Sequence, residues 1–123
     1  MDDIKLLNPA TLAFVGDAVY SLLVRTYLVN KSSRSGGLHD MAVEFVKAPS
    51  QAKAIKKIEP FLSADEIAIF KRGRNFHTSN TPKSSSNADY HTATGLECLF
   101  GFLHLSGNSD RITELFSIII KDA

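Results

Sequence analysis

The stretch NPATLAFVGDAVYSLLVRTYLVN, residues 8–30, decides the fold because it predicts one long and very apolar helix. Asn8 is a good N-cap, and Pro9 follows it at the first helical position, where its missing N–H costs nothing. The helix then runs from Ala10 to about Asn30. Its apolar side chains are spread all the way round, so we expect a central, buried helix.

Shorter helices are predicted along the rest of the chain from apolar residues three and four positions apart and from signals at the helix ends. They cover about residues 38–46, 50–58, 64–72, 89–105 and 109–119. Pro49 separates the first two, and Ser63 with Glu66 has the form of a capping box. Residues 73–88 read as a long polar loop. No stretch alternates with a period of two for long enough to be a strand, so we expect an all-α fold in one domain, residues 1–123.

The composition is that of an ordinary globular protein, with 44% hydrophobic and 22% charged residues. The single cysteine, Cys98, cannot form an internal disulfide, which favours a reducing compartment. The acidic start of the chain lacks the cationic region of a signal peptide, and no apolar run approaches the ~18 residues that span a bilayer. We therefore expect a cytoplasmic protein with no membrane segment.

Positive charge is concentrated in one part of the chain, although the net charge is only +1. Residues 18–88 hold 11 basic and 5 acidic residues, and residues 67–88 hold no acid at all. A basic surface of this kind suits a polyanionic partner. Solvated helix faces are an equally good explanation from charge alone.

Two acidic residues interrupt the apolar helices. Asp17 lies in the middle of the first helix, and Glu97 lies in the helix predicted for residues 89–105. Burial of an ionised carboxylate without a partner is costly, so each acid should be paired or bind a metal. The residues four positions to either side of each acid are small, which leaves room for an ion and its waters. Gly16 and Gly101 weaken these helices by about 1 kcal/mol each relative to alanine, which indicates close backbone packing there.

The two carboxylates converge if these two helices pack together. Carboxylate oxygens and retained waters are the ligands that Mg²⁺ prefers, and such an ion can activate water for attack on a phosphodiester. The alternative is that Asp17 and Glu97 form structural ion pairs with Arg25 or a lysine. The residues alone leave both interpretations open.

Three motifs resemble those of a known family. Residues 14–19, FVGDAV, are similar to the signature helix of the ribonuclease III catalytic domain, and residues 97–101, ECLFG, resemble the segment that carries its second essential acid. Residues 71–75, KRGRN, with residues 81–83, TPK, resemble the marker of the short Mini-ribonuclease III branch. The motifs occur in the family's order, and the likeness extends over residues 7–117.

The resemblance implies a helical homodimer without a double-stranded-RNA-binding domain. It implies cleavage of double-stranded RNA with Mg²⁺, for which Mn²⁺ substitutes, to give 5′-phosphomonoesters. The implied substrate is the precursor of large-subunit (23S) ribosomal RNA, with a ribosomal protein as a candidate further partner. Asp17 and Glu97 are implied as the catalytic, metal-binding residues.

The basic segment suits duplex RNA, which is recognised largely through phosphates and 2′-hydroxyls. Cations and small polar groups that can make such contacts are Arg72, Arg74, Asn75, Thr81 and Lys83. Arg74 and Asn75 have the alternative role of capping the preceding helix and bracing the loop.

The set of acids is thinner than in the full-length family. Ala10 and Ala13 stand where that family has acids, Thr94 stands where it has an aspartate, and residues 35–37 offer no acid. A metal should therefore bind weakly before RNA arrives. The thin set also motivates an alternative, a catalytically inactive, duplex-RNA-binding ribosome-assembly factor. A third hypothesis is a helical adaptor whose basic face meets an acidic protein.

Overall fold

The computed structural model describes residues 3–31, 36–76 and 87–121. Within these ranges the helices are α1 (Pro9–Lys31), α2 (Leu38–Val46), α3 (Ala48–Ile58), α4 (Ala64–Arg74), α5 (Asn87–Leu105) and α6 (Ser109–Ile120). Two short 3₁₀ turns, η1 (Ile4–Leu6) and η2 (Glu59–Phe61), precede α1 and follow α3. The described residues contain no strand, so the all-α prediction is confirmed.

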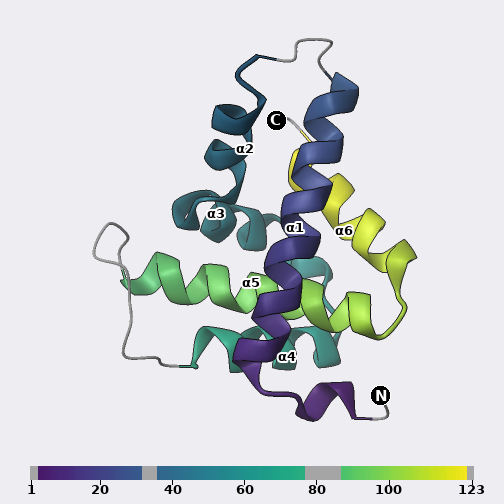
Figure 1. The fold of residues 1–123 in the computed structure, drawn as a ribbon. Coiled ribbons are helices and arrows are strands. Elements are labelled where there is room, and N and C mark those ends of the chain that lie inside the picture. Colours follow the sequence, from purple (N-terminus) through teal and green to yellow (C-terminus); the bar gives the residue numbers. More distant parts are fainter. Residues whose placement is uncertain (1–2, 32–35, 77–86, 122–123) are drawn as a thin grey trace.

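The central helix of the fold is α5, which packs against α1, α3, α4 and α6. Figure 1 shows α1 crossing over α5, with α2 and α3 beside the upper part of α1 and α4 beneath α5. Leu96, Leu99 and Phe100 of α5 are completely buried. Burial on this scale makes α5 the element against which the other helices are placed.

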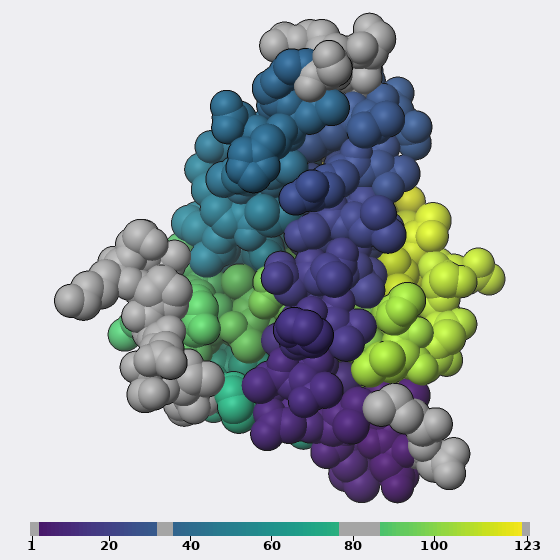
Figure 2. Space-filling view, in the orientation of Figure 1, coloured from purple at the N-terminus to yellow at the C-terminus, as the bar shows by residue number. Residues whose placement is uncertain are grey.

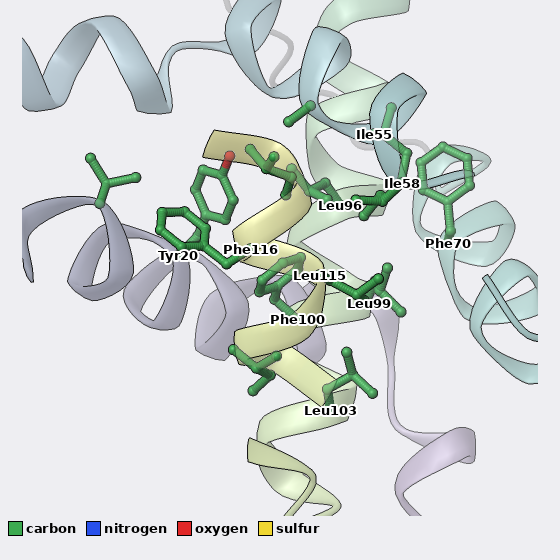
Figure 3. Packing of buried hydrophobic residues seen from close by; sticks show 14 of the residues in the cluster. Tyr20, Ile55, Ile58, Phe70, Leu96, Leu99, Phe100, Leu103, Leu115 and Phe116 are labelled. Atoms are coloured by element: carbon green, nitrogen blue, oxygen red, sulfur yellow. The ribbon is translucent and has the colours of Figure 1, made fainter. Parts of the chain in front are cut away.

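An aromatic cluster fixes α1 to the core. The Tyr20 ring of α1 meets Phe100 of α5 edge to face at 5.4 Å between centroids, and Phe116 of α6 at 5.9 Å. Figure 3 shows Tyr20, Phe100 and Phe116 among the side chains of the apolar cluster. Edge-to-face packing of aromatic rings adds a directional contribution to area burial, so Tyr20 helps to set the rotation of α1 about its axis.

The prediction that α1 is buried all round is wrong. One face packs against α5 and α2, whereas Phe14 is 81% exposed, Leu22 66% and Val29 59%. Figure 2 shows α1, coloured purple to blue, running uncovered along one face of the molecule. By length and mean hydropathy alone α1 could also cross a membrane, although one of its faces packs against α5.

The backbones of α1 and α5 touch at two glycines. A Cβ atom placed on Gly16 would lie 1.6 Å from the carbonyl oxygen of Glu97, and one on Gly101 would lie 2.0 Å from that of Leu12. No side chain fits at either point. The close backbone packing predicted from these glycines is confirmed, and it brings the residues beside them, Asp17 and Glu97, to the same place.

The capping residues predicted for two helix starts are present in the structure. Asn8 caps α1 through a hydrogen bond from the Ala10 N–H to its Oδ1 (2.8 Å). The capping box at α4 is complete, with the Glu66 N–H donating to Ser63 Oγ (3.2 Å) and the Ser63 N–H donating to Glu66 Oε1 (2.8 Å). Such caps satisfy backbone donors that the first turn leaves without a helical partner.

The polar loop is shorter than residues 73–88. Helix α4 continues to Arg74 and α5 already begins at Asn87. Gly73 is buried inside α4, and a Cβ there would lie 2.6 Å from Cys98 Sγ. Tertiary contact with α5 therefore overrides the helix-breaking tendency of this glycine.

We predict that Gly16→Ala lowers the free energy of unfolding by about 3 kcal/mol or more, because the new methyl group meets rigid backbone. Urea denaturation measures the change. Gly36→Ala is the matched control, since a Cβ at Gly36 has open space around it, and it should alter stability by less than about 0.5 kcal/mol. Equal effects of the two substitutions would contradict the close contact.

Candidate active site

Asp17 of α1 and Glu97 of α5 line one pocket of about 260 Å³. The complete lining is Ala10, Ala13, Phe14, Asp17, Phe76, Tyr90, Thr94 and Glu97. The two acids are 80 positions apart in the sequence, and the glycine contact between α1 and α5 brings them together. The pocket is therefore a product of the α1–α5 crossing.

The two carboxylates differ in burial. Glu97 is half-buried, whereas Asp17 is exposed. The expectation that Asp17 lies buried in a central helix is wrong, because its side of α1 faces away from the core. Asp17 therefore stands on the solvent side of the pocket, and Glu97 stands on the side nearer the core.

The two acids interact electrostatically. The pKa of Glu97 is raised to about 7, first by burial and then by the negative charge of Asp17, and a hydrogen bond with Asp17 acts in the same direction. A hydrogen bond from Gln51 favours the ionised form and opposes these effects. A cation held by both carboxylates would stabilise their ionised forms and remove the repulsion.

Gln51, near the start of α3, is a buried hydrogen-bond partner of Glu97 that does not itself line the pocket. Its Nε2 donates to the Val46 carbonyl oxygen (2.8 Å) and to Glu97 Oε2 (3.3 Å). The side chain is 3% exposed, and its Oε1 has no hydrogen-bond partner in the described structure. Sequence reasoning missed this residue, although it is the only glutamine in the chain.

Neither acid is neutralised by a cation in the described part of the chain. The ion pairs of the described residues include those of Lys5 with Asp65, of Lys47 with Glu44, and of Arg111 with Glu66 and Glu114. Arg25, the cation considered for a structural pair, lines a different pocket beside Leu28 and Val29. Arg25 therefore does not form the structural ion pair considered for the two carboxylates.

The donor set suits a hydrated, weakly held divalent ion. No group of three or more His, Cys, Asp or Glu side chains that could hold a metal occurs among the described residues. Ala10, Ala13 and Thr94, at positions where the resemblance expects acids, all line the pocket without adding a carboxylate. The Thr94 hydroxyl donates to the Tyr90 carbonyl oxygen (3.1 Å). Two carboxylates with several waters are compatible with Mg²⁺.

The candidate RNA-binding residues have structural partners where the chain is described. The exposed Arg72 guanidinium donates to the carbonyl oxygens of Lys5 and Leu7, the latter at 2.9 Å, and so tethers the segment before α1. Arg74 Nε donates to Asn75 Oδ1 (3.3 Å). The contact between Arg74 and Asn75 fits the alternative role considered for these two residues, which is to brace the end of the helix and the following loop.

The other RNA-binding candidates are Thr81 and Lys83, which lie outside the described residues. Phe76, directly after Asn75, lines the pocket of the two acids. The end of α4 therefore adjoins the pocket, although the structure brings none of the basic candidates into its lining.

Comparison with known proteins identifies the family. A model described as the Ribonuclease III domain matches residues 10–108. The chain belongs to the ribonuclease III family. Mini-ribonuclease 3 of Clostridium tetani is 40% identical over 97% of this chain and 80% of its own, and that of Streptococcus pneumoniae is 37% identical over 98% and 97%. These relatives place the chain in the Mini-ribonuclease III branch, as the motifs predicted, and its activity is that of an endoribonuclease.

A solved structure agrees with this family assignment. The crystal structure of a Fusobacterium nucleatum protein matches with a TM-score of 0.86 and 30% sequence identity, over 99% of this chain and 98% of that one. The helical fold is thus shared along nearly the whole chain.

We predict that Asp17→Asn lowers the pKa of Glu97 from about 7, because it removes a nearby negative charge. Burial remains, so the pKa should stay above the ordinary value for glutamate. Titration of the Glu97 carboxyl carbon by NMR in metal-free protein measures the change. Asp65→Asn removes an acid of α4 that is paired with Lys5 of η1, and it should leave the Glu97 pKa unchanged. An unchanged Glu97 pKa in Asp17→Asn would show that the two acids do not interact.

Proposed function

We propose that the protein is a divalent-metal-dependent endoribonuclease that cuts both strands of double-stranded RNA as a homodimer in the cytoplasm. The observation that carries the proposal is the convergence of Asp17 and Glu97 in one pocket, where burial and then the negative charge of Asp17 raise the pKa of Glu97. Two acids held together without a cationic partner in the described structure are well suited to a metal ion.

Asp17 and Glu97 would hold the ion, and the pocket between them has room for its retained waters. A bound Mg²⁺, or Mn²⁺ in its place, would polarise the phosphodiester and lower the pKa of a water molecule. With only two protein carboxylates, ion binding should be weak until phosphate oxygens of the RNA supply further ligands. Glu97, with a pKa of about 7, must lose its proton to take part.

The residues of the chain then act on the phosphodiester by position and charge. Asp17 and Glu97 would hold the ion so that its positive charge faces one phosphate of the duplex. Hydrolysis forms a bond from a water oxygen to phosphorus and breaks the bond from phosphorus to the 3′ oxygen. The proton balance leaves a 3′-hydroxyl on one product and a 5′-phosphate on the other.

The substrate that we propose is the duplex at the ends of the 23S ribosomal RNA precursor, with a ribosomal protein as a further partner. The motifs of the Mini-ribonuclease III branch and the relatives that carry this name support the assignment. Charge supports it too, because residues 67–88 carry only basic charges. Arg74 and Asn75 directly precede Phe76, a residue of the pocket lining, in the sequence.

The uncovered face of α1 supports a homodimer. Phe14, Leu22 and Val29 are largely exposed on one helix, and an apolar pocket of about 470 Å³ lies beside Phe14 and Leu22. A two-fold axis would place each exposed face against the same face of a second copy. Asp17 lines both this pocket and the pocket of the acids. The two active sites would therefore lie beside the interface, one for each strand.

We predict that Asp17→Asn reduces cleavage of a labelled RNA duplex in Mg²⁺ by more than about a hundredfold, because the ion loses one of two carboxylate ligands. Duplex binding and the melting temperature should remain close to those of the wild type. Asp65→Asn is the matched control and should retain activity.

The same assay separates the alternatives. Binding of the duplex by wild-type protein without any cleavage in Mg²⁺ or Mn²⁺ would favour the inactive assembly factor. Absence of RNA binding, or binding without a steep dependence on salt, would favour the adaptor. Full activity of Asp17→Asn would contradict the mechanism.

We predict that Leu22→Glu converts the protein from dimer to monomer, because it places a charge in the apolar face of α1. Sedimentation velocity measures the mass. Leu6→Glu, at a residue of η1 that is 76% exposed, should leave the dimer intact. A Leu22→Glu protein with the mass of a dimer would show that this face is not the interface.

A further inference from the structure

Gln51 connects three elements through a single side-chain amide. It lies in α3, donates to Val46 at the end of α2, and donates to Glu97 on α5. The NH₂ group has two hydrogens, and these two contacts use both of them. The hydrogen bond to the Val46 carbonyl oxygen, at 2.8 Å, anchors the amide to the end of α2. Only one residue, Lys47, separates this end of α2 from the start of α3. The amide therefore presents its second hydrogen to Glu97 from a fixed position.

The orientation of this amide follows from its surroundings. Both partners of Nε2 are oxygen acceptors, so a flipped amide would place its own oxygen against a carbonyl and a carboxylate oxygen. The unflipped amide leaves Oε1 buried without a partner in the described structure. An unpaired buried acceptor lowers stability, and such a group needs an explanation. An apolar side chain of similar size would fill the same space without this cost.

We propose that Gln51 is a positioning residue that fixes the orientation of the Glu97 carboxylate for the divalent ion. The inference rests on the proposed function, which makes Glu97 a metal ligand. A carboxylate has two oxygens, and the hydrogen bond from Gln51 occupies Oε2 of Glu97. This bond holds the orientation of the carboxylate in the pocket that Glu97 shares with Asp17, where the ion would bind. Partners that orient a ligand in this way typically change metal affinity tenfold or more when they are removed.

The wild-type protein offers a direct test, because its only glutamine gives a side-chain amide pair that NMR can assign without ambiguity. We expect Mg²⁺, added to RNA-free protein, to shift this amide pair with the same dissociation constant as the backbone amide of Asp17. If Asp17 responds and the Gln51 amide pair does not, the role of Gln51 is overturned and the proposed metal site stands. If neither residue responds, the metal site itself is contradicted and the inference falls with it.

A variant pair separates positioning from packing. Gln51→Met keeps the approximate volume and removes both N–H donors, so it should weaken Mn²⁺ binding to RNA-free protein by about tenfold. It should also lower kcat at a fixed Mg²⁺ concentration with little change in KM for the duplex, and extra Mg²⁺ should restore the rate. Ile55→Val alters another buried residue of α3 and should lower stability without changing Mn²⁺ affinity.

Wild-type Mn²⁺ affinity in Gln51→Met would overturn the proposal, as would an equal loss of affinity in Ile55→Val. If Gln51→Met does not fold, the Mg²⁺ titration of the wild-type amide pair decides alone.

Discussion

The backbone contact between α1 and α5 at Gly16 and Gly101 is the constraint on which the active site depends. Neither position has room for a Cβ atom, since the opposing carbonyl oxygens lie where one would be. Asp17 follows Gly16 directly, and Glu97 lies one turn before Gly101. The contact that packs the two helices therefore also sets the two carboxylates side by side. Because protein interiors are densely packed, the helices cannot relax this contact without disturbing the site.

The active site contains groups that lower the stability of the protein when no ligand is bound. Burial and the charge of Asp17 raise the pKa of Glu97, and Gln51 keeps a buried oxygen without a partner in the described structure. Groups that are costly in the free protein and useful with a ligand are typical of functional sites. The stabilising contacts lie elsewhere, in the edge-to-face rings around Tyr20 and in the partly buried ion pair of Glu66 with Arg111.

Local sequence signals predicted the helices, whereas several contacts between helices became known only from the structure. The caps at Asn8 and Ser63 act within one turn, so the sequence alone reveals them. The glycines beside Asp17 and Glu97 likewise indicated the close contact. The exposed face of α1 was missed because hydropathy does not show which side of an apolar helix packs against the rest of the chain. Gln51 was missed because its partner Glu97 is 46 positions away.

A double-mutant cycle on metal affinity tests the central claim most directly. Calorimetric titration with Mn²⁺ would compare wild-type protein, Asp17→Asn, Glu97→Gln and the double variant, all without RNA. If one ion is held by both carboxylates, each single variant loses most of the binding free energy, and the double variant loses little more than either. Losses that simply add, or a single variant with wild-type affinity, would show that the two acids do not share an ion.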